Sequence, residues 1–387
     1  MKIRRILFWL HLVAGVTAGA VILLMSVTGV LLTYEIQVID WADRDVRLVK
    51  PVEGAARLPV ESLLASFERQ QGTLPASLMI RRDAREAALL SSGRTGGYYV
   101  DPYTGKVLGE GSKGTRAFFR KVTEWHRWFA ASGENRAAAR AVTGAANLLF
   151  LFLVVTGAYL WLPRKWQWRN IRPVAVLRGG LSGKARDFHW HNVFGIWCAV
   201  PLFFVVLTGV VMSYPWANDL LFRLADGKAA RSAPPRREPP RGEAARVSAE
   251  GLNLLWPRAE KQVATWKSIT LRLPSVSDRA VQFTIDEGNG RQPQKRATLT
   301  LDRRSGSLVR WEPFESNSLG RRLRSWVRFG HTGEALGVVG QTIAGVASAA
   351  GVLLVWTGIA LALRRFFAWK RRGVRVAPRE TREKVAV

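Results

Sequence analysis

The chain contains only five histidines, and their positions are the first indication of chemistry. They are His11, His126, His189, His191 and His331. Imidazole is the commonest side-chain ligand of metals in proteins. Every one of the five lies at the start of a long apolar segment or shortly before one. Because ionisable side chains at membrane depth are costly and are usually functional, we expect these histidines to bind a ligand.

The apolar segments are long enough to cross a bilayer. Four stretches contain no Asp, Glu, Lys or Arg: 6–34, 141–163, 188–218 and 335–363. Each exceeds the roughly 20 residues that a membrane-spanning helix needs, and a helix in a globular core has no reason to be apolar on every face. The first stretch is also longer than the core of a signal peptide, which has about 7–15 residues. The sequence therefore predicts four transmembrane helices.

The distribution of charge predicts the orientation of these helices. Segments 1–5, 164–187 and 364–387 carry 3, 7 and 9 basic residues against 0, 1 and 2 acidic ones. Short basic loops face the cytoplasm, whereas loops much longer than about 60 residues, such as 35–140 and 219–334, escape this rule. Both termini are therefore predicted to be cytoplasmic. The net charge of +29 is interpreted as topology signal and affinity for anionic lipid, because no nucleic-acid-binding motif accompanies it.

An internal repeat relates the two halves of the chain. Each apolar segment contains a Thr-Gly pair, namely Thr28-Gly29, Thr156-Gly157, Thr208-Gly209 and Thr357-Gly358. His11 and His191 both lie 17 residues before the Thr-Gly pair of their own segment, and both are followed by a glycine four residues later. The second and fourth segments match more loosely, with His126 and His331 lying 30 and 26 residues before their pairs. We predict a tandem duplication.

The loops between the apolar segments repeat as well. "YYVDPYTGKVLGE" and "TLTLDRRSGSLVRW" both have the pattern strand, turn, strand, with Gly105 and Gly306 at the turn position that favours positive φ. "PVESLLASFERQ" predicts a helix in the first loop, and alternation in "SITLRLPS", "AVQFTIDE" and "ATLTLD" predicts strands in the second. The Pro- and Arg-rich segment 229–246 is typical of a linker. Two small α+β domains are expected, one in each loop.

These features resemble the PepSY-associated transmembrane family, and within it the FoxB-type reductases of ferric siderophores. The shared motifs are "LHLVAG", "WHRW", "DFHWHNVFG", "HTGEALG" and the two D-x-x-[TS]-G hairpins. The resemblance implies a bacterial inner membrane, haem b inside the helix bundle and electron transfer to a periplasmic acceptor. The expected fold is thus an α-helical four-helix transmembrane bundle with two periplasmic α+β, PepSY-like domains. The expected order is helix 1–34, domain 35–125, amphipathic segment and helix 126–163, cytoplasmic loop 164–187, helix 188–218, domain 219–330, helix 331–363 and cytoplasmic tail 364–387.

The predicted topology sorts four histidines into two pairs. His11 and His191 fall at the cytoplasmic leaflet, and His126 and His331 at the opposite one. Six-coordinate haem iron takes two axial ligands, one on each face, so two b-type haems are expected, each held by one pair. Other interpretations stay open for single residues. His11 could reach to the membrane surface, His126 could belong to an aromatic belt, and His331 could be an ordinary loop residue.

The neighbours of these histidines have less certain roles. His189 and His191 are two positions apart, which is about 200° of helix rotation, so they cannot both face one iron. The spacing shared with His11 selects His191. His189 is left with three candidate roles: a haem propionate contact, an alternative ligand, or a cap of its helix. Arg127 and Arg186 are predicted either to pair with propionates or to act only as topology signals.

Missing motifs restrict the function further. The sequence has no G-x-G-x-x-G after a strand, so electrons are expected from a partner, either a cytoplasmic flavoprotein or a membrane quinol. The single cysteine, Cys198, excludes an intrachain disulfide and a c-type haem attachment site. The predicted function is reduction of a periplasmic ferric siderophore, with no catalytic residue assigned. The alternatives are a haem redox protein with another acceptor, such as a quinone or a periplasmic enzyme, and a non-enzymatic membrane protein that regulates a peptidase.

Overall fold

A computed structural model describes residues 2–51, 54–91, 96–163, 165–228 and 247–374. The predicted linker 229–246 lies outside these residues. The chain forms two compact units. We call residues 1–30, 125–210 and 343–387 the membrane unit, and residues 31–124 and 211–342 the sheet unit.

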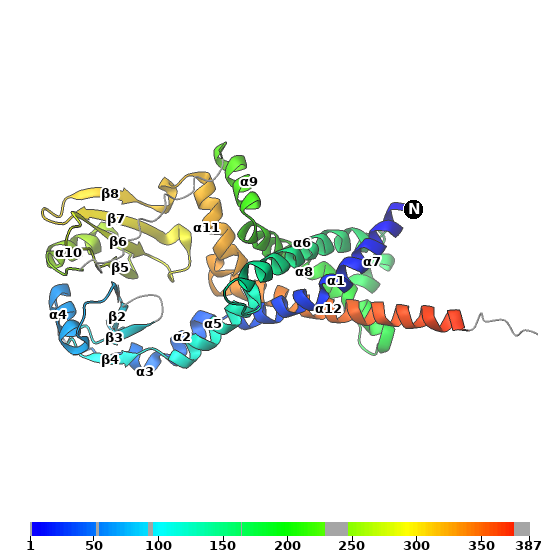
Figure 1. The fold of residues 1–387 in the computed structure, drawn as a ribbon, viewed down its shortest axis with the longest axis horizontal. Helices are drawn as coiled ribbons and strands as arrows, with labels where there is room; N and C mark the ends of the chain where they lie inside the picture. The colour runs from blue at the N-terminus through cyan, green and yellow to red at the C-terminus, as the bar shows by residue number, and fades with distance from the viewer. Residues whose placement is uncertain (1, 52–53, 92–95, 164, 229–246, 375–387) are drawn as a thin grey trace, which may run out of the picture. The chain divides into compact units, whose positions relative to one another are not determined.

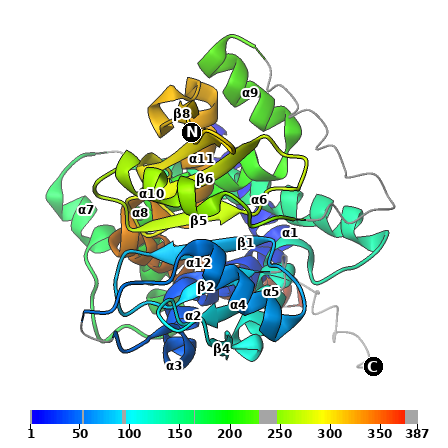
Figure 2. The same cartoon turned by 90° about the vertical axis from the view of Figure 1, so that its left-hand side faces the viewer.

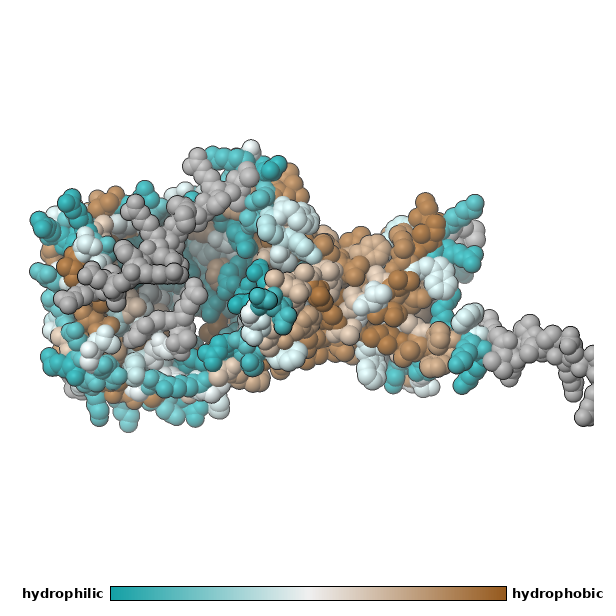
Figure 3. Space-filling view, in the orientation of Figure 1, coloured by the Kyte–Doolittle hydropathy of each residue, from teal (hydrophilic) through white to brown (hydrophobic). Residues whose placement is uncertain are grey.

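The membrane unit contains four long apolar helices (Figure 1). They are α1 (Lys2–Leu32), α6 (Asn135–Trp161), α8 (Gly183–Ser213) and α12 (Gly337–Val374). Each is long and apolar enough to cross a membrane, and the side chains that cover them are mostly hydrophobic (Figure 3). The prediction of a multi-pass membrane protein with four candidate spans is thereby confirmed.

Small side chains let these helices approach closely. A Cβ added to Gly351 of α12 would lie 2.7 Å from Oγ of Ser26 in α1. Between α6 and α8, the buried Asn147 amide donates to the carbonyl of Val206 at 3.1 Å, and Gly209 leaves space for that amide. Close packing of small residues and interhelical hydrogen bonds hold helices together in lipid. Apolar side chains alone do not, because they are as favourable in contact with lipid as with another helix.

The sheet unit is built on one antiparallel sheet of eight strands (Figure 2). Its order is β4-β3-β2-β1-β5-β6-β7-β8. The strands are β1 (Ser77–Arg81), β2 (Ala88–Ser91), β3 (Gly97–Val100), β4 (Val107–Glu110), β5 (Ser268–Arg272), β6 (Ala280–Asp286), β7 (Arg296–Asp302) and β8 (Leu308–Glu312). Because β1 pairs with β5 over five residues, the two loops that were expected to form separate domains share one continuous sheet.

Two helices cover the same face of this sheet, α4 (Val60–Gln71) and α10 (Leu252–Gln262). Their apolar residues and those of the strands form a single core that includes Phe67, Trp256 and Phe283. The helix N-termini also cap one another. The Asn253 side chain accepts from the backbone N–H of Glu61 at 3.1 Å, and the Glu61 carboxylate accepts from the backbone N–H of Asn253 at 3.0 Å. These bonds satisfy N–H groups that a helix leaves without partners in its first turn.

The predicted hairpins and the helix at "PVESLLASFERQ" are confirmed. Gly105 and Gly306 have φ of 72° and 65° and donate to the carbonyls of Asp101 and Asp302, both at 2.9 Å. The three strands predicted in the second loop are β5, β6 and β7. Strands β1 and β2 and helix α10 have no counterpart among the sequence predictions.

The remaining helices are shorter, and along the sequence most of them come between the strands and the long helices or between two long helices. They are α2 (Glu35–Ala42), α3 (Arg44–Arg47), α5 (Lys113–Trp128), α7 (Trp168–Ala175), α9 (Pro215–Asp226), α11 (Leu319–His331) and the short 3-10 helices η1 (Pro293–Lys295), η2 (Phe314–Ser316) and η3 (Glu334–Leu336). Between α2 and α3 lies Asp43, which is only 1% exposed. Its carboxylate accepts from the Arg116 guanidinium (3.0 and 2.5 Å), the Tyr99 hydroxyl (3.0 Å) and the backbone N–H of Ser112 (2.6 Å).

Candidate functional site

The membrane unit brings His11 of α1 and His191 of α8 together. Their ring centroids are 6.4 Å apart, and the ring planes are nearly perpendicular, at 85°. Both histidines lie in the first part of a long apolar helix, in the positions that the repeat relates to each other. Two residues 180 positions apart in the sequence thus form one pair.

A threonine from a neighbouring helix holds each ring. Nδ1 of His11 is 2.8 Å from Oγ1 of Thr156 in α6, and Nδ1 of His191 is 2.9 Å from Oγ1 of Thr357 in α12. Each hydroxyl also lies 2.7 Å from the carbonyl oxygen four residues earlier in its own helix, that of Phe152 or Leu353. A hydroxyl has a single proton, and a carbonyl can only accept. With its proton donated to the carbonyl, each threonine accepts from the histidine.

This arrangement favours one tautomer of each histidine. If Nδ1–H donates to threonine, the other nitrogen of the neutral imidazole, Nε2, carries a lone pair. The described residues give Nε2 of His11 and His191 no hydrogen-bond partner. Metals are ligated by neutral imidazole. In this form Nδ1–H donates a hydrogen bond and the Nε2 lone pair is available to the metal.

A third histidine is held in the same way. Nδ1 of His126, near the end of α5, is 2.8 Å from Oγ1 of Thr28 in α1, and that hydroxyl lies 2.7 Å from the carbonyl of Leu24. The geometry is therefore repeated at a separate place in the membrane unit. His331 is the last residue of α11 and belongs to the sheet unit.

The glycine of three of the four Thr-Gly pairs lies next to a histidine ring. A Cβ added to Gly157 would lie 3.2 Å from Cε1 of His11, and one added to Gly358 would lie 3.4 Å from Cε1 of His191. At Gly29 the distance to Cε1 of His126 would be 3.7 Å. The Thr-Gly pairs are visible in the sequence, but small residues in membrane helices usually indicate helix packing, so the pairs alone do not point to the histidines.

The spacing of the two rings suits a single metal ion between them. An imidazole nitrogen lies about 2 Å from a transition metal that it ligates, so two imidazoles that bind one ion from opposite sides place their ring centres about 6 Å apart. The observed 6.4 Å matches this value. No group of three or more His, Cys, Asp or Glu that could hold a metal occurs among the described residues. The donor set of two imidazoles fits haem iron, whose other four ligands come from the macrocycle.

The sequence of the chain matches one family model over nearly its whole length. The model is that of the PepSY-associated TM region, and it covers residues 8–365. The chain belongs to this family. No curated protein matches it.

In this PepSY-associated protein, His189 occupies a different environment from His191. It is buried, its Nε2 accepts from the backbone N–H of Arg178 at 2.9 Å, and its Nδ1 donates to the carbonyl of Pro173 at 3.0 Å. Trp161 and Trp197 donate to the next two carbonyls of α7, those of Val174 and Ala175. The three side chains together satisfy carbonyls at the C-terminus of α7, which have no partner within the helix. Both nitrogens of His189 are used by the backbone, so we assign it a structural role.

The two arginines named from the sequence also have partners within the chain. Arg186 pairs with the buried carboxylate of Asp187 at 2.9 Å and lies over the ring of Trp190. Arg364 of α12 binds the other oxygen of Asp187 at 3.1 Å. Arg127 lies over the ring of Trp128, and its backbone carbonyl accepts from Thr143. Neither arginine depends on a cofactor for its position.

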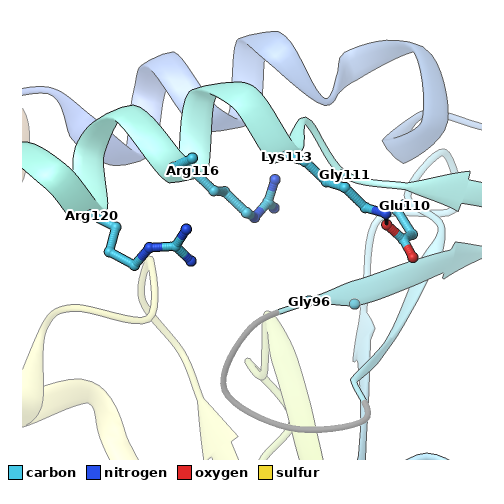
Figure 4. A pocket seen from close by; sticks show the side chains of 8 residues that line it. Gly96, Glu110, Gly111, Lys113, Arg116 and Arg120 are labelled. Carbon is cyan, nitrogen blue, oxygen red and sulfur yellow. Dashed lines mark ion pairs between the residues drawn. The ribbon is translucent and has the colours of Figure 1, made fainter.

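The sheet unit of this family member contains a cavity of about 230 Å³ beside α5. Figure 4 shows basic side chains extending from the helix toward the strand that begins near Gly96. Lys113 forms an ion pair with Glu110, and Arg116 is bound to Asp43, which leaves Arg120 as the one lining cation that no acidic side chain balances among the described residues. A single exposed arginine does not identify a ligand, so we assign none to this cavity.

Proposed function

We propose that this protein is a haem b electron-transfer protein of the bacterial inner membrane that reduces a ferric siderophore in the periplasm and releases the iron as Fe(II). The observation that carries the proposal is the pair His11 and His191. Their ring centroids are 6.4 Å apart, and a threonine accepts from Nδ1 of each. Neither Nε2 atom has a hydrogen-bond partner among the described residues, so both lone pairs are available to a metal.

The chemistry of bis-histidine ligation agrees with this role. When bound between two imidazoles, haem supplies a one-electron carrier whose iron has no open coordination position. The chain contributes the two ligands and a dry surrounding. Ala18, Ile22 and Ala146 form a buried apolar cluster in α1 and α6 and pack with Phe150 and Leu153. Such apolar packing keeps water away from the site and lowers the local dielectric constant.

The second haem of the proposal is held by His126 and His331. The hydrogen bond of His126 to Thr28 supports it, because it prepares this ring in the same way as those of His11 and His191. The partnership with His331 rests on the sequence repeat. The duplication itself is supported by two equivalent relations, since the histidine of α1 is held by α6 and the histidine of α8 by α12.

The acceptor and the donor are proposed from the sequence. A ferric siderophore follows from the resemblance to FoxB-type reductases, and the 22 basic against 13 acidic residues of segment 219–334 favour an anionic complex. Reduction loosens the iron because the hard oxygen ligands of a siderophore hold the divalent ion less tightly. The donor is a cytoplasmic flavoprotein or a quinol, with both termini of the chain in the cytoplasm.

An optical experiment on the purified full-length chain in detergent tests this function. We expect a Soret band, a low-spin α-band on reduction, and two haems per chain by pyridine haemochrome analysis. The dithionite-reduced protein, freed of excess reductant, is then mixed with ferric siderophores and a ferrous-iron chelator. Each Fe(III) that is reduced should reoxidise one haem and yield one chelated Fe(II).

Two results would reject parts of the proposal. Absence of haem from the protein would reject the redox function and favour the non-enzymatic alternative, in which the PepSY-like region regulates a peptidase. Haem that is reoxidised by a quinone analogue, but by no ferric siderophore, would reject the siderophore and favour another acceptor. A dithionite-treated sample without protein is the control for direct reduction of the ferric siderophore by residual reductant. His11→Ala protein, which should lose one haem, should yield one chelated Fe(II) fewer per chain.

A further inference from the structure

We propose that Thr156 and Thr357 are positioning residues for the two histidines: they fix the tautomer and the plane of His11 and His191, and so set the reduction potential of the haem that these residues bind. The inference rests on the proposed function for the haem, but its structural part concerns only residues of this chain.

The first step of the argument is the direction of the hydrogen bonds. The Thr156 hydroxyl is 2.7 Å from the Phe152 carbonyl and 2.8 Å from Nδ1 of His11. The Thr357 hydroxyl has the same pair of neighbours, at 2.7 and 2.9 Å. Because the helix backbone holds the carbonyl in place, the hydroxyl proton is committed and the oxygen lone pair points at the ring. A valine has the same shape as threonine but cannot accept, whereas a serine can.

The second step is the effect on the ligand. A hydrogen-bond acceptor at Nδ1–H makes the imidazole a stronger electron donor to the metal through Nε2. A stronger donor stabilises the more highly charged ferric state over the ferrous state, so the threonine lowers the reduction potential. Loss of the hydroxyl should therefore raise it. The threonine hydroxyl is itself polarised by donating to a carbonyl, and such chains of hydrogen bonds strengthen one another.

The third step concerns the ring planes. Each ring is held at Nδ1 by the threonine, which restricts rotation about its axis. Its Cε1 lies 3.2 or 3.4 Å from the position that a Cβ on Gly157 or Gly358 would occupy. The resulting planes are 85° apart. Perpendicular imidazole planes interact with different d orbitals of low-spin ferric iron and leave two of them nearly equal in energy. The expected consequence is a strongly anisotropic EPR signal, with its largest g value above that of parallel planes.

The repetition of the arrangement argues against chance. Thr28 accepts from His126 and lies 2.7 Å from the Leu24 carbonyl, at a separate place in the bundle. Other threonines of the long helices show that the pattern is not general. Thr17 of α1 bonds only to the carbonyls of its own helix, those of Val13 and Ala14.

The test compares Thr156→Val and Thr357→Val with the corresponding serine variants and with Thr17→Val as the matched control. In the valine variants we expect a higher midpoint potential for one haem and a smaller largest g value in its ferric EPR signal. The serine variants should behave like the wild type, and Thr17→Val should change neither quantity. Valine variants with unchanged potential and unchanged EPR signal would overturn the proposal.

Two further results are informative if a variant assembles poorly. Loss of one haem in the valine variants but not in the serine variants would support the proposal, because only the hydroxyl distinguishes them. Equal loss in both would overturn it. A Gly157→Ala variant keeps the hydroxyl but places a methyl group 3.2 Å from Cε1 of His11, which is tighter than an ordinary contact. It should therefore alter the EPR signal by turning the ring.

A measurement without haem separates this inference from the proposed function. If the purified wild type contains no haem, the proposed function fails, whereas the tautomers can still be read from ¹⁵N chemical shifts of labelled histidine. We expect His11 and His191 as Nδ1–H tautomers, and loss of that preference for His11 in Thr156→Val. Nε2–H tautomers in the wild type would overturn the inference itself.

Discussion

Each of the two compact units contains a polar centre, and the two centres differ in how many of their polar atoms have partners within the chain. In the sheet unit, the Asp43 carboxylate accepts from Arg116, Tyr99 and Ser112, so both oxygens have partners within the chain. In the membrane unit, His11 and His191 each use Nδ1 and have no partner for Nε2 among the described residues. The Asp43 centre is satisfied within the chain, whereas the histidine pair has two nitrogen lone pairs that are available to a ligand.

His189 and His191 show the same contrast within one helical turn. Both nitrogens of His189 are bound to backbone atoms at the C-terminus of α7, so this histidine is complete. His191 points to the other side of α8 and uses only one nitrogen. The residue type is the same at the two positions, whereas His189 is buried and His191 is half-buried. The number of ring nitrogens with partners distinguishes the structural histidine from the candidate ligand.

Removing a candidate ligand should have the largest effect. His11→Ala and His191→Ala should each reduce the haem content from two per chain to one, because one imidazole cannot hold low-spin iron on both faces. His189→Ala should keep both haems and instead lower the thermal stability, since a backbone donor and an acceptor of the α7 region lose their partner. Pyridine haemochrome analysis and thermal unfolding measure the two effects. Loss of haem from His189→Ala with full retention in His191→Ala would reverse the assignment of the two residues.

The parts of the fold that sequence could predict are those with a strong local signal. Four long stretches without charge predicted α1, α6, α8 and α12, and the Asp-x-x-Thr/Ser-Gly turns predicted two hairpins. The pairing of β1 with β5 could not be predicted, because it joins residues nearly 200 positions apart. The first strand, "SLMIR", is also too short to show a distinctive periodicity.

In the candidate site, too, local signals were predictable from the sequence and long-range contacts were not. Residue type and the repeat selected His11 and His191, since histidine is rare in this chain. The threonine hydrogen bonds were not predictable, because they join residues 145 and 166 positions apart and depend on the rotation of each helix about its axis. The role of His189 depends on the positions of Pro173 in α7 and of Arg178 in the segment after it, and the sequence has no periodic signal for either.

A single substitution can remove the charge at the Asp43 centre. Asp43→Asn removes the charge that balances Arg116, and breaking a buried ion pair in this way typically costs about 3–5 kcal/mol. We expect a clearly lower unfolding temperature of the sheet unit, with the Soret band of the folded protein unchanged. Asp45→Asn is the matched control, because Asp45 is 84% exposed in its pairing with Arg44. Exposed pairs contribute about 0–1 kcal/mol, and equal effects of the two substitutions would contradict the importance of the centre.

The same centre should make stability depend on pH at both extremes. Burial alone would raise the pKa of Asp43, but the hydrogen bonds from Arg116 and Ser112 outweigh it and the pKa is lowered. Burial and the neighbouring Asp43 charge raise the pKa of Tyr99 to about 12. A lowered carboxyl pKa stabilises the fold above about pH 4, the unfolded value, and this contribution is lost as the pH falls further. A raised tyrosine pKa stabilises the fold below about pH 10, and this contribution is lost as the pH rises toward 12.

Unfolding temperatures measured across the pH range can separate these two contributions. Asp43→Asn should flatten the acid side of the profile, and Tyr99→Phe the alkaline side. A wild-type profile that stays level from pH 10 to 12 would show that Tyr99 does not titrate differently in the folded and unfolded states.

The smallest expected effect concerns the turn that follows His126. Phe129 and Ala130 have φ of 54° and 55°, a left-handed conformation that costs about 1–2 kcal/mol for residues with a side chain. The turn comes directly after His126 and Arg127, which are held by Thr28 and Thr143. We infer that these hydrogen bonds keep the backbone in its strained form. Ala130→Gly should relieve part of the cost and raise the unfolding temperature slightly, while Ala131→Gly, at a position without positive φ, should lower it or leave it unchanged.

If the turn is strained in order to orient His126, Ala130→Gly should also keep the haem content and potential of the wild type, because glycine accepts the same conformation. A stabilised variant with an altered haem would instead show that the strain itself tunes the ligand.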